Sequence, residues 1–132
     1  MKLVFDTSSY CDFAEGLPDA VNAISTYGQS IFIPSVVLGE LLFGFMKGTK
    51  QGFNERKLRQ IVNRLKIEII DINADVARKY AMIYLSLQRK GTKIPMNDVW
   101  VAASCMEVGG TLITRDKHFE YVDQIETMVL SS

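Results

Sequence analysis

Short apolar runs recur along the chain, and most of them are followed by a longer segment with helical spacing. Four runs have the length of buried strands, namely KLVF (2–5), SIFIP (30–34), IEII (67–70) and TLIT (111–114). A fifth and weaker run is ETMVL (126–130). The pattern therefore predicts four clear strands and one weaker strand.

Helical signals fill the segments between these runs. A short helix is expected over 7–16, and a second over 18–28, which begins with proline and ends with glycine. The segment 53–66 has the spacing of an amphipathic helix. Its apolar stripe consists of Leu58, Ile61, Val62 and Leu65.

Two further helices follow in the second half of the chain. Asn73 is expected to cap a helix that ends at Gly91, and NDVWVAASCMEVGG (97–110) is the next. In the first of these, one face is expected to hold Val76, Tyr80, Tyr84 and Leu87. The alternation of strands and helices predicts one α/β domain over residues 1–132, with a mainly parallel five-stranded sheet and helices on both faces.

The helix expected over 36–48, with Ser35 as its cap, is apolar nearly all round, and Glu40 is its one acid. One face must pack on the sheet, and the other faces need a cover. Burial within the same chain is the expectation, with a second protomer or a partner peptide as alternatives.

Composition narrows the function classes. Of 132 residues, 48% are hydrophobic and 23% charged, with a formal net charge of zero, so disorder and a bulk attraction to nucleic acid are not indicated. The two cysteines lie far apart and there is one histidine, which argues against a disulfide framework and a zinc site. Reduced thiols, no signal-peptide core and no membrane-spanning run predict a cytoplasmic protein without membrane attachment.

Four acids are expected at one edge of the sheet. Asp6 directly follows the first strand, and Asp116 lies two residues beyond the fourth. Asp98 begins the helix that leads into the fourth strand, and Glu40 lies about one turn into the helix that leaves the second. All four therefore belong to the carboxyl edge, where parallel sheets bind their ligands, and Asp6, Asp98 and Asp116 converge there if the first and fourth strands are neighbours.

Carboxylates that are close together repel one another unless a proton or a cation intervenes. Oxygen ligands suit Mg²⁺ or Mn²⁺, and such ions activate water for phosphoryl displacement. Each acid also has a purely structural explanation, as a turn residue, a first-turn helix acid or an ion-pair partner. Their shared edge favours a metal-dependent phosphodiester or phosphoryl enzyme. At 97–98, Asn97 is expected to cap the helix and Asp98 to bind the metal from its first turn, where the helix dipole favours an ionised carboxylate.

At these residues the chain resembles the PIN-domain nucleases, in particular the VapC-type toxins. The resemblance lies in LVFDTSS, in IPSVVLGELLFG and, most specifically, in IPMNDVWVAASCMEVGGTLITRDKHF. Tyr10 and Cys11 depart from it, because aliphatic residues are commoner there. The resemblance implies a PIN-like fold and Mg²⁺- or Mn²⁺-dependent RNA cleavage, with a homodimer and an antitoxin as partners.

The resemblance also implies roles for single residues. Asp6 and Asp98 would be direct metal ligands, with Glu40 and Asp116 completing the catalytic cluster, in part through water. The expected polar support comes from Thr7, Ser8, Asn97 and Thr114.

RNA contacts are expected from two basic segments. Residues 47–66 hold seven cationic side chains against one acid, and 88–93 form a second basic stretch. The candidate RNA-binding residues are Lys47, Lys50, Arg56, Lys57, Arg59, Arg89, Lys90 and Lys93. A solvated helix face is the alternative explanation, and His118 is expected to be an ordinary surface residue.

Two other functions stay open from the sequence. One is a non-catalytic PIN-like adaptor that binds RNA or protein. The other is an aspartyl-phosphate phosphohydrolase, since VFDTS places an Asp after the first strand. Such enzymes usually carry a second acid two residues later, where this chain has Ser8.

Overall fold

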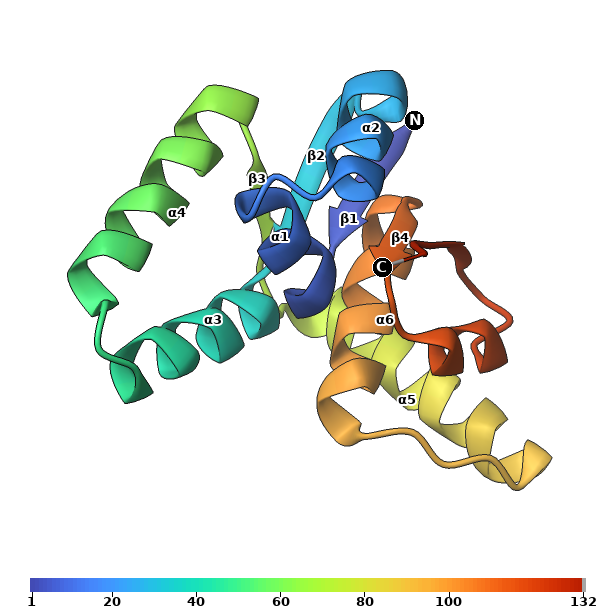
Figure 1. The fold of residues 1–132 in the computed structure, drawn as a ribbon. Coiled ribbons are helices and arrows are strands. Elements are labelled where there is room, and N and C mark those ends of the chain that lie inside the picture. The colour runs from blue at the N-terminus through green and yellow to red at the C-terminus, as the bar shows by residue number, and fades with distance from the viewer. Residues whose placement is uncertain (132) are drawn as a thin grey trace.

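A five-stranded parallel sheet forms the centre of the computed structural model, which describes residues 1–131 (Figure 1). The strand order is β3-β2-β1-β4-β5, and every neighbouring pair is parallel. The strands are β1 (Lys2–Phe5), β2 (Ser30–Pro34), β3 (Glu68–Ile70), β4 (Thr111–Thr114) and β5 (Glu126–Val129). The predicted α/β class and all five strands, including the weaker fifth, are confirmed.

Six α-helices and one 3₁₀ helix connect these strands within residues 1–131. They are α1 (Thr7–Ala14), α2 (Pro18–Tyr27), α3 (Ser35–Lys47), α4 (Gln51–Leu65), α5 (Ala74–Lys90), α6 (Met96–Val108) and η1 (Lys117–Tyr121). Figure 1 shows α1 and α2 beside β1, α5 paired with α6, and the α3–α4 hairpin extending away from the sheet. Each predicted helix is present, with ends that differ by a few residues.

The central strand β1 explains the layering. Its Leu3, Val4 and Phe5 have no solvent exposure, although successive side chains of a strand point to opposite faces. Helices must therefore cover both faces of the sheet at β1. Because β1 lies between β2 and β4, Asp6 and the residues after β4 emerge side by side at the carboxyl edge.

Besides the hydrophobic core around the sheet, a second cluster of buried apolar side chains joins α5 to α6. Val76, Ile83 and Leu87 of α5 are buried there, with Ala102 and Ala103 on α6. Alanine side chains let the two helices approach closely. On the predicted face of α5, Val76 and Leu87 are buried, and Tyr84 packs against Tyr80 with ring centroids 5.8 Å apart while staying 37% exposed.

Helix capping differs from the prediction at two of three positions. Asn73 caps α5 as expected, with its side chain accepting a hydrogen bond from the Val76 backbone N–H at 3.0 Å. Ser35 and Asn97 are not caps, because α3 and α6 each begin one residue after a proline. That proline already has an extended backbone and supplies the first carbonyl acceptor, so the residues after it lie inside the helix.

The expectation that α3 is buried within the monomer is wrong for part of its surface. Val37 and Leu41 are buried against the core, but Phe43 is 63% and Met46 59% exposed. Phe53 on α4 is also 57% exposed. The α3–α4 hairpin thus presents apolar side chains that this chain does not cover.

Candidate metal centre at the carboxyl edge of the sheet

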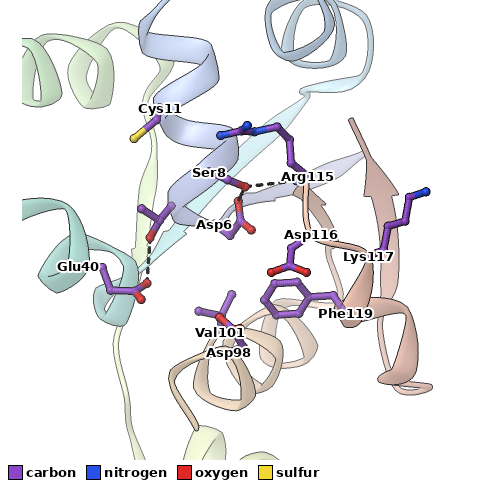
Figure 2. A pocket seen from close by; sticks show the side chains of 11 residues that line it. Asp6, Ser8, Cys11, Glu40, Asp98, Val101, Arg115, Asp116, Lys117 and Phe119 are labelled. Carbon is purple, nitrogen blue, oxygen red and sulfur yellow. Dashed lines mark hydrogen bonds between the residues drawn. The ribbon is translucent and has the colours of Figure 1, made fainter. Parts of the chain in front are cut away.

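An open pocket at the carboxyl edge brings together the four predicted acids (Figure 2). Asp6 enters from the end of β1, Glu40 from α3, Asp98 from α6, and Asp116 from the loop after β4. These elements are distant in sequence, and the parallel order of β2, β1 and β4 places their ends together. The geometry follows from the fold, as the strand-end positions predicted.

Asp6 is the most firmly held of these acids, with 6% exposure. It is the N-cap of α1, where its Oδ1 accepts hydrogen bonds from the Ser9 backbone N–H at 2.9 Å and the Ser8 hydroxyl at 3.0 Å. The Ser9 hydroxyl in turn accepts from the Asp6 backbone N–H at 3.0 Å, which completes a capping box. The position of Asp6 after β1 was predicted from the sequence, but its capping role was not.

Thr114 connects Asp6 to Asp116. Its buried hydroxyl donates to Asp6 Oδ2 and accepts from the Asp116 backbone N–H at 2.9 Å. Ser8 makes a parallel link, since its hydroxyl also accepts from the Arg115 backbone N–H at 3.2 Å. These contacts fix the β4–η1 loop against the start of α1.

Glu40 lies on the side of the pocket opposite Asp116, and it has a hydrogen-bond partner of its own (Figure 2). Its Oε1 accepts a hydrogen bond from the Thr7 hydroxyl at 2.9 Å. Three of the four residues expected to give polar support, Thr7, Ser8 and Thr114, thus touch one of the acids. Asn97 does not, because it is exposed in the first turn of α6 and does not line the pocket.

Asp98 and Asp116 are bridged by His118. The His118 Nε2 lies 2.6 Å from Asp98 Oδ2, and its Nδ1 lies 2.6 Å from Asp116 Oδ1. A neutral imidazole donates from only one nitrogen, so two such contacts require a further proton on the imidazole or on a carboxyl group. The expectation that His118 is an ordinary surface residue is wrong.

Burial raises the pKa of Asp98 above its ordinary value. The hydrogen bond and the charge of His118 work against this, while the neighbouring Asp116 and Glu40 carboxylates raise the pKa further. The dipole of α6 was expected to keep Asp98 ionised, whereas burial shifts the pKa of this carboxyl upward, toward its neutral form. A cation in the pocket would reverse the balance.

The donor set fits a hard divalent cation. Ligand atoms of Asp98, Asp116 and His118 lie within 4.8 Å of one another, and Asp6 and Glu40 line the same pocket. Carboxylate oxygens are the donors that Mg²⁺ and Mn²⁺ prefer, and imidazole adds a nitrogen beside them. Cys11 lines the pocket, but burial raises the pKa of its thiol, as it raises that of Cys105 in the core to about 12, so both thiols stay protonated at neutral pH.

The predicted RNA-binding cations lie elsewhere. None of the eight predicted residues lines the acidic pocket, whereas Arg115 and Lys117, which sequence inspection did not select, do. Lys90 is bound to its own chain, through Asp123 at 2.6 Å and the Tyr121 carbonyl at 2.8 Å. Arg115, Lys117 and His118 all lie within two residues of Asp116 in TRDKHF. This closeness to a predicted site residue was the signal by which the sequence could have identified them.

Comparison with known proteins gives a consistent result. The PIN domain family model matches residues 3–125. Ribonuclease VapC2 of Rickettsia felis is 34% identical over 98 residues, covering 74% of this chain and 72% of the relative. Ribonuclease VapC4 of Mycobacterium tuberculosis is 24% identical over 95 residues, covering 72% and 73%.

Solved structures agree with the same fold. VapBC2 from Rickettsia felis, bound to a DNA fragment from its promoter, has a TM-score of 0.89 at 25% identity and covers 99% of this chain and 100% of that one. DNA-bound VapBC from Salmonella typhimurium has a TM-score of 0.83 at 23% identity, covering 98% of both chains. Among residues 1–131, no helix combines the length and apolar character needed to cross a membrane.

Proposed function

Because the chain belongs to the PIN-domain family, with a VapC ribonuclease among its relatives, we propose that it is a divalent-metal-dependent endoribonuclease and the toxin of a toxin–antitoxin pair. The observation that carries the proposal is the pocket in which Asp6, Glu40, Asp98 and Asp116 meet. A carboxylate-lined, open pocket suits a metal-assisted hydrolysis of a phosphodiester, whose product oxygens also prefer hard cations.

Asp6 and Asp98 are the proposed direct ligands of the ion, with Asp116 and Glu40 completing the site, in part through water. The bound ion would supply activation of a water molecule and neutralise charge on the phosphate. The Thr114 and Ser8 hydroxyls orient Asp6, and the Thr7 hydroxyl orients Glu40. His118 holds the Asp98 and Asp116 carboxylates at a fixed separation. Mg²⁺ or Mn²⁺ is the proposed ion.

The two alternative functions have less support. In a phosphohydrolase, Asp6 would attack as a nucleophile, and such enzymes usually carry a second acid two residues later, where this chain has Ser8. A non-catalytic adaptor would not need the Asp6 and Glu40 carboxylates to be held by Thr7, Ser8 and Thr114. Neither alternative explains why these hydroxyls surround the pocket.

Partners form the second part of the proposal. Among similar solved structures, VapBC-5 from Mycobacterium tuberculosis is a member of the VapBC family of toxin–antitoxin systems. We include a cognate antitoxin and a homodimer for this chain, since exposed apolar side chains occur on two surfaces. One is the α3–α4 hairpin with Phe43, Met46 and Phe53, and the other is α5 with Met82 and Leu85. An RNA substrate and two free thiols suit a cytoplasmic location.

Cleavage of a fluorescent single-stranded RNA tests the function. We expect cleavage with Mg²⁺ or Mn²⁺, none with EDTA, and none by the Asp98→Asn variant, which should remain folded by circular dichroism. A single-stranded DNA of the same sequence and p-nitrophenyl phosphate are the control substrates. RNA that binds but stays intact under all metals would favour an adaptor, and hydrolysis of p-nitrophenyl phosphate alone would favour a phosphohydrolase.

A further inference from the structure

The acidic pocket would attract a cation but repel the phosphates of an RNA strand. Binding a polyanion next to four carboxylates therefore requires positive side chains nearby. Within residues 1–131, the cations that line this pocket are Arg115 and Lys117. They immediately flank Asp116, so the same loop supplies one acid and two positive charges.

Both cations also line a neighbouring open cleft. The other residues of that cleft are Glu120 from η1 and the segment 129–131 that ends β5. Arg115 and Lys117 thus stand on the ridge between the acidic pocket and the second cleft. A strand with its cleaved bond at the acids could continue over this ridge into the second cleft.

Arg115 is prepared for such a contact. Its Nε donates to Asp12 Oδ2 at 3.0 Å, and Asp12 is buried with 4% exposure. The backbone N–H of Arg115 is held by Ser8 at 3.2 Å, yet 44% of its side chain is exposed. The anchored Nε leaves the terminal N–H groups of the guanidinium for another acceptor, and a fixed side chain loses little entropy on binding.

Lys117 complements Arg115. It is exposed, and Figure 2 shows its ammonium pointing away from the four acids, on the opposite side from the Arg115 guanidinium. Lys79 and Lys90 each form an ion pair with an acid, whereas Lys117 has no such pair among residues 1–131. Its charge is therefore directed to solvent beside the pocket.

We propose that Arg115 and Lys117 bind the RNA backbone phosphates that flank the cleaved bond, and that the strand leaves the acidic pocket across them into the adjoining cleft. This inference rests on the proposed ribonuclease function. It differs from the sequence-based expectation, which assigned RNA contact to the basic segments on α4 and at the end of α5. The contacts are to phosphates and carry no base specificity.

The structural alternative is that Arg115 only neutralises buried Asp12. A buried carboxylate does need a partner, and that accounts for the Nε contact. It does not account for the exposure of the rest of the guanidinium, nor for Lys117 on the other flank. The two explanations predict different salt dependence of RNA binding.

The test measures binding of a labelled single-stranded RNA by fluorescence anisotropy over a range of KCl concentrations. All proteins carry Asp98→Asn so that the RNA stays intact. Arg115→Gln and Lys117→Gln should each weaken binding about tenfold and reduce the slope of log K against log salt by about 0.7. Arg115→Lys should keep most of the slope. Arg78→Gln on α5, which does not line either cleft, is the matched control and should change neither quantity.

Because Arg115→Gln leaves a buried carboxylate without its partner, the double variant Asp12→Asn/Arg115→Gln provides a folded alternative. We expect it to bind RNA as weakly as Arg115→Gln alone. Wild-type affinity and slope in this double variant and in Lys117→Gln would overturn the inference, as would an equal loss in Arg78→Gln. If the unmodified protein cleaves RNA while these variants bind normally, only the phosphate path is wrong. If it cleaves no RNA under any metal, the ribonuclease function itself is wrong.

Discussion

Asp6 and Asp98 face the same pocket, but the protein holds them in different ways. Asp6 is almost fully buried, and both of its oxygens accept hydrogen bonds from Ser8, Ser9 and Thr114. Asp98 is more exposed, and its side chain contacts His118. One carboxylate belongs to the hydrogen-bonded framework, whereas the other is held by a group that itself titrates.

This difference assigns two tasks to one site. The Asp6 side joins β1, α1 and β4 and is formed when the chain folds. On the Asp98 side, burial raises the pKa of the carboxyl group, so its ionised form is disfavoured until a cation arrives. We infer that Asp6 fixes the position of the bound ion and that the Asp98 side responds to its binding.

The largest expected difference between the two sides is in stability, when Asp6 and Asp98 are each replaced by alanine. Asp6→Ala removes the N-cap of α1 and leaves the buried Thr114 hydroxyl without its acceptor, so the free energy of unfolding should fall by about 2–4 kcal/mol. Asp98→Ala should change it by less than about 1 kcal/mol, since the cost of desolvating the Asp98 carboxylate offsets its contact with His118. Both should reduce RNA cleavage by more than about 100-fold.

Urea unfolding of the metal-free proteins, with cleavage measured in parallel, provides the check. Asp75→Ala, in the exposed first turn of α5, is a control for substituting a first-turn acid. Equal losses of stability at Asp6 and Asp98 would remove the distinction between the two sides.

A second and smaller difference is expected between the Thr114 hydroxyl, which holds Asp6, and the Thr7 hydroxyl, which holds Glu40. Thr114→Val keeps the shape of a buried side chain but removes the donor to Asp6, and should cost about 1–3 kcal/mol and lower cleavage about 10–100-fold. Thr7→Val removes the donor to half-exposed Glu40 and should cost about 0.5–1.5 kcal/mol. Thermal unfolding and cleavage rates measure both. A larger effect of Thr7→Val would mean that Glu40, rather than Asp6, anchors the site.

Much of this architecture follows from sequence because it depends on position along strands and helices. Strand ends placed Asp6 and Asp116 at one edge, and the helix flanking each neighbouring strand placed Asp98 and Glu40 there. The apolar stripe of α4 was also visible, with Leu58 and Ile61 buried as predicted. Apolar periodicity and the ends of strands are local properties, and the parallel order of β2, β1 and β4 turns them into a shared edge.

The features that sequence did not reveal depend on contacts between distant residues. His118 meets Asp98 across 20 positions, and the Asp12–Arg115 pair joins α1 to the end of β4. Nothing local marks His118 as different from a surface histidine. The error at Asn97 has another origin, because Asn is a favoured N-cap but Pro95 had already started the helix. Composition likewise made 47–66 the most basic segment without indicating that it lies away from the pocket.

Substituting His118 alters the Asp98 side of the pocket without removing an acid. If His118 positions Asp98 and Asp116, the His118→Asn variant should bind Mn²⁺ about tenfold more weakly, as for other groups that orient metal ligands. Isothermal titration of Mn²⁺ measures this directly, and cleavage should recover toward the wild-type rate at high Mn²⁺. Phe119 next to it is buried, so exposed Glu120→Gln is the better control in the same helix. Tighter Mn²⁺ binding in His118→Asn would instead mean that the imidazole competes with the metal.

The smallest effect concerns pH and the metal-free protein. Since burial raises the folded-state pKa of Asp98, the folded state binds a proton more readily than the unfolded state. This group's contribution to stability is therefore greatest below its unfolded pKa and declines as pH rises through the raised folded value. Asp98→Asn carries no titrating group, so it should weaken this decline and be more stable than wild type at neutral pH in EDTA. Saturating Mg²⁺ should cancel the advantage, because the ion stabilises only the wild-type carboxylate. Urea midpoints from pH 4 to 8, with and without Mg²⁺, test this, and Asp75→Asn should follow the wild-type profile. If Asp98→Asn is less stable than wild type at every pH without metal, then Asp98 belongs to the framework with Asp6, and the proposed division between the two sides fails.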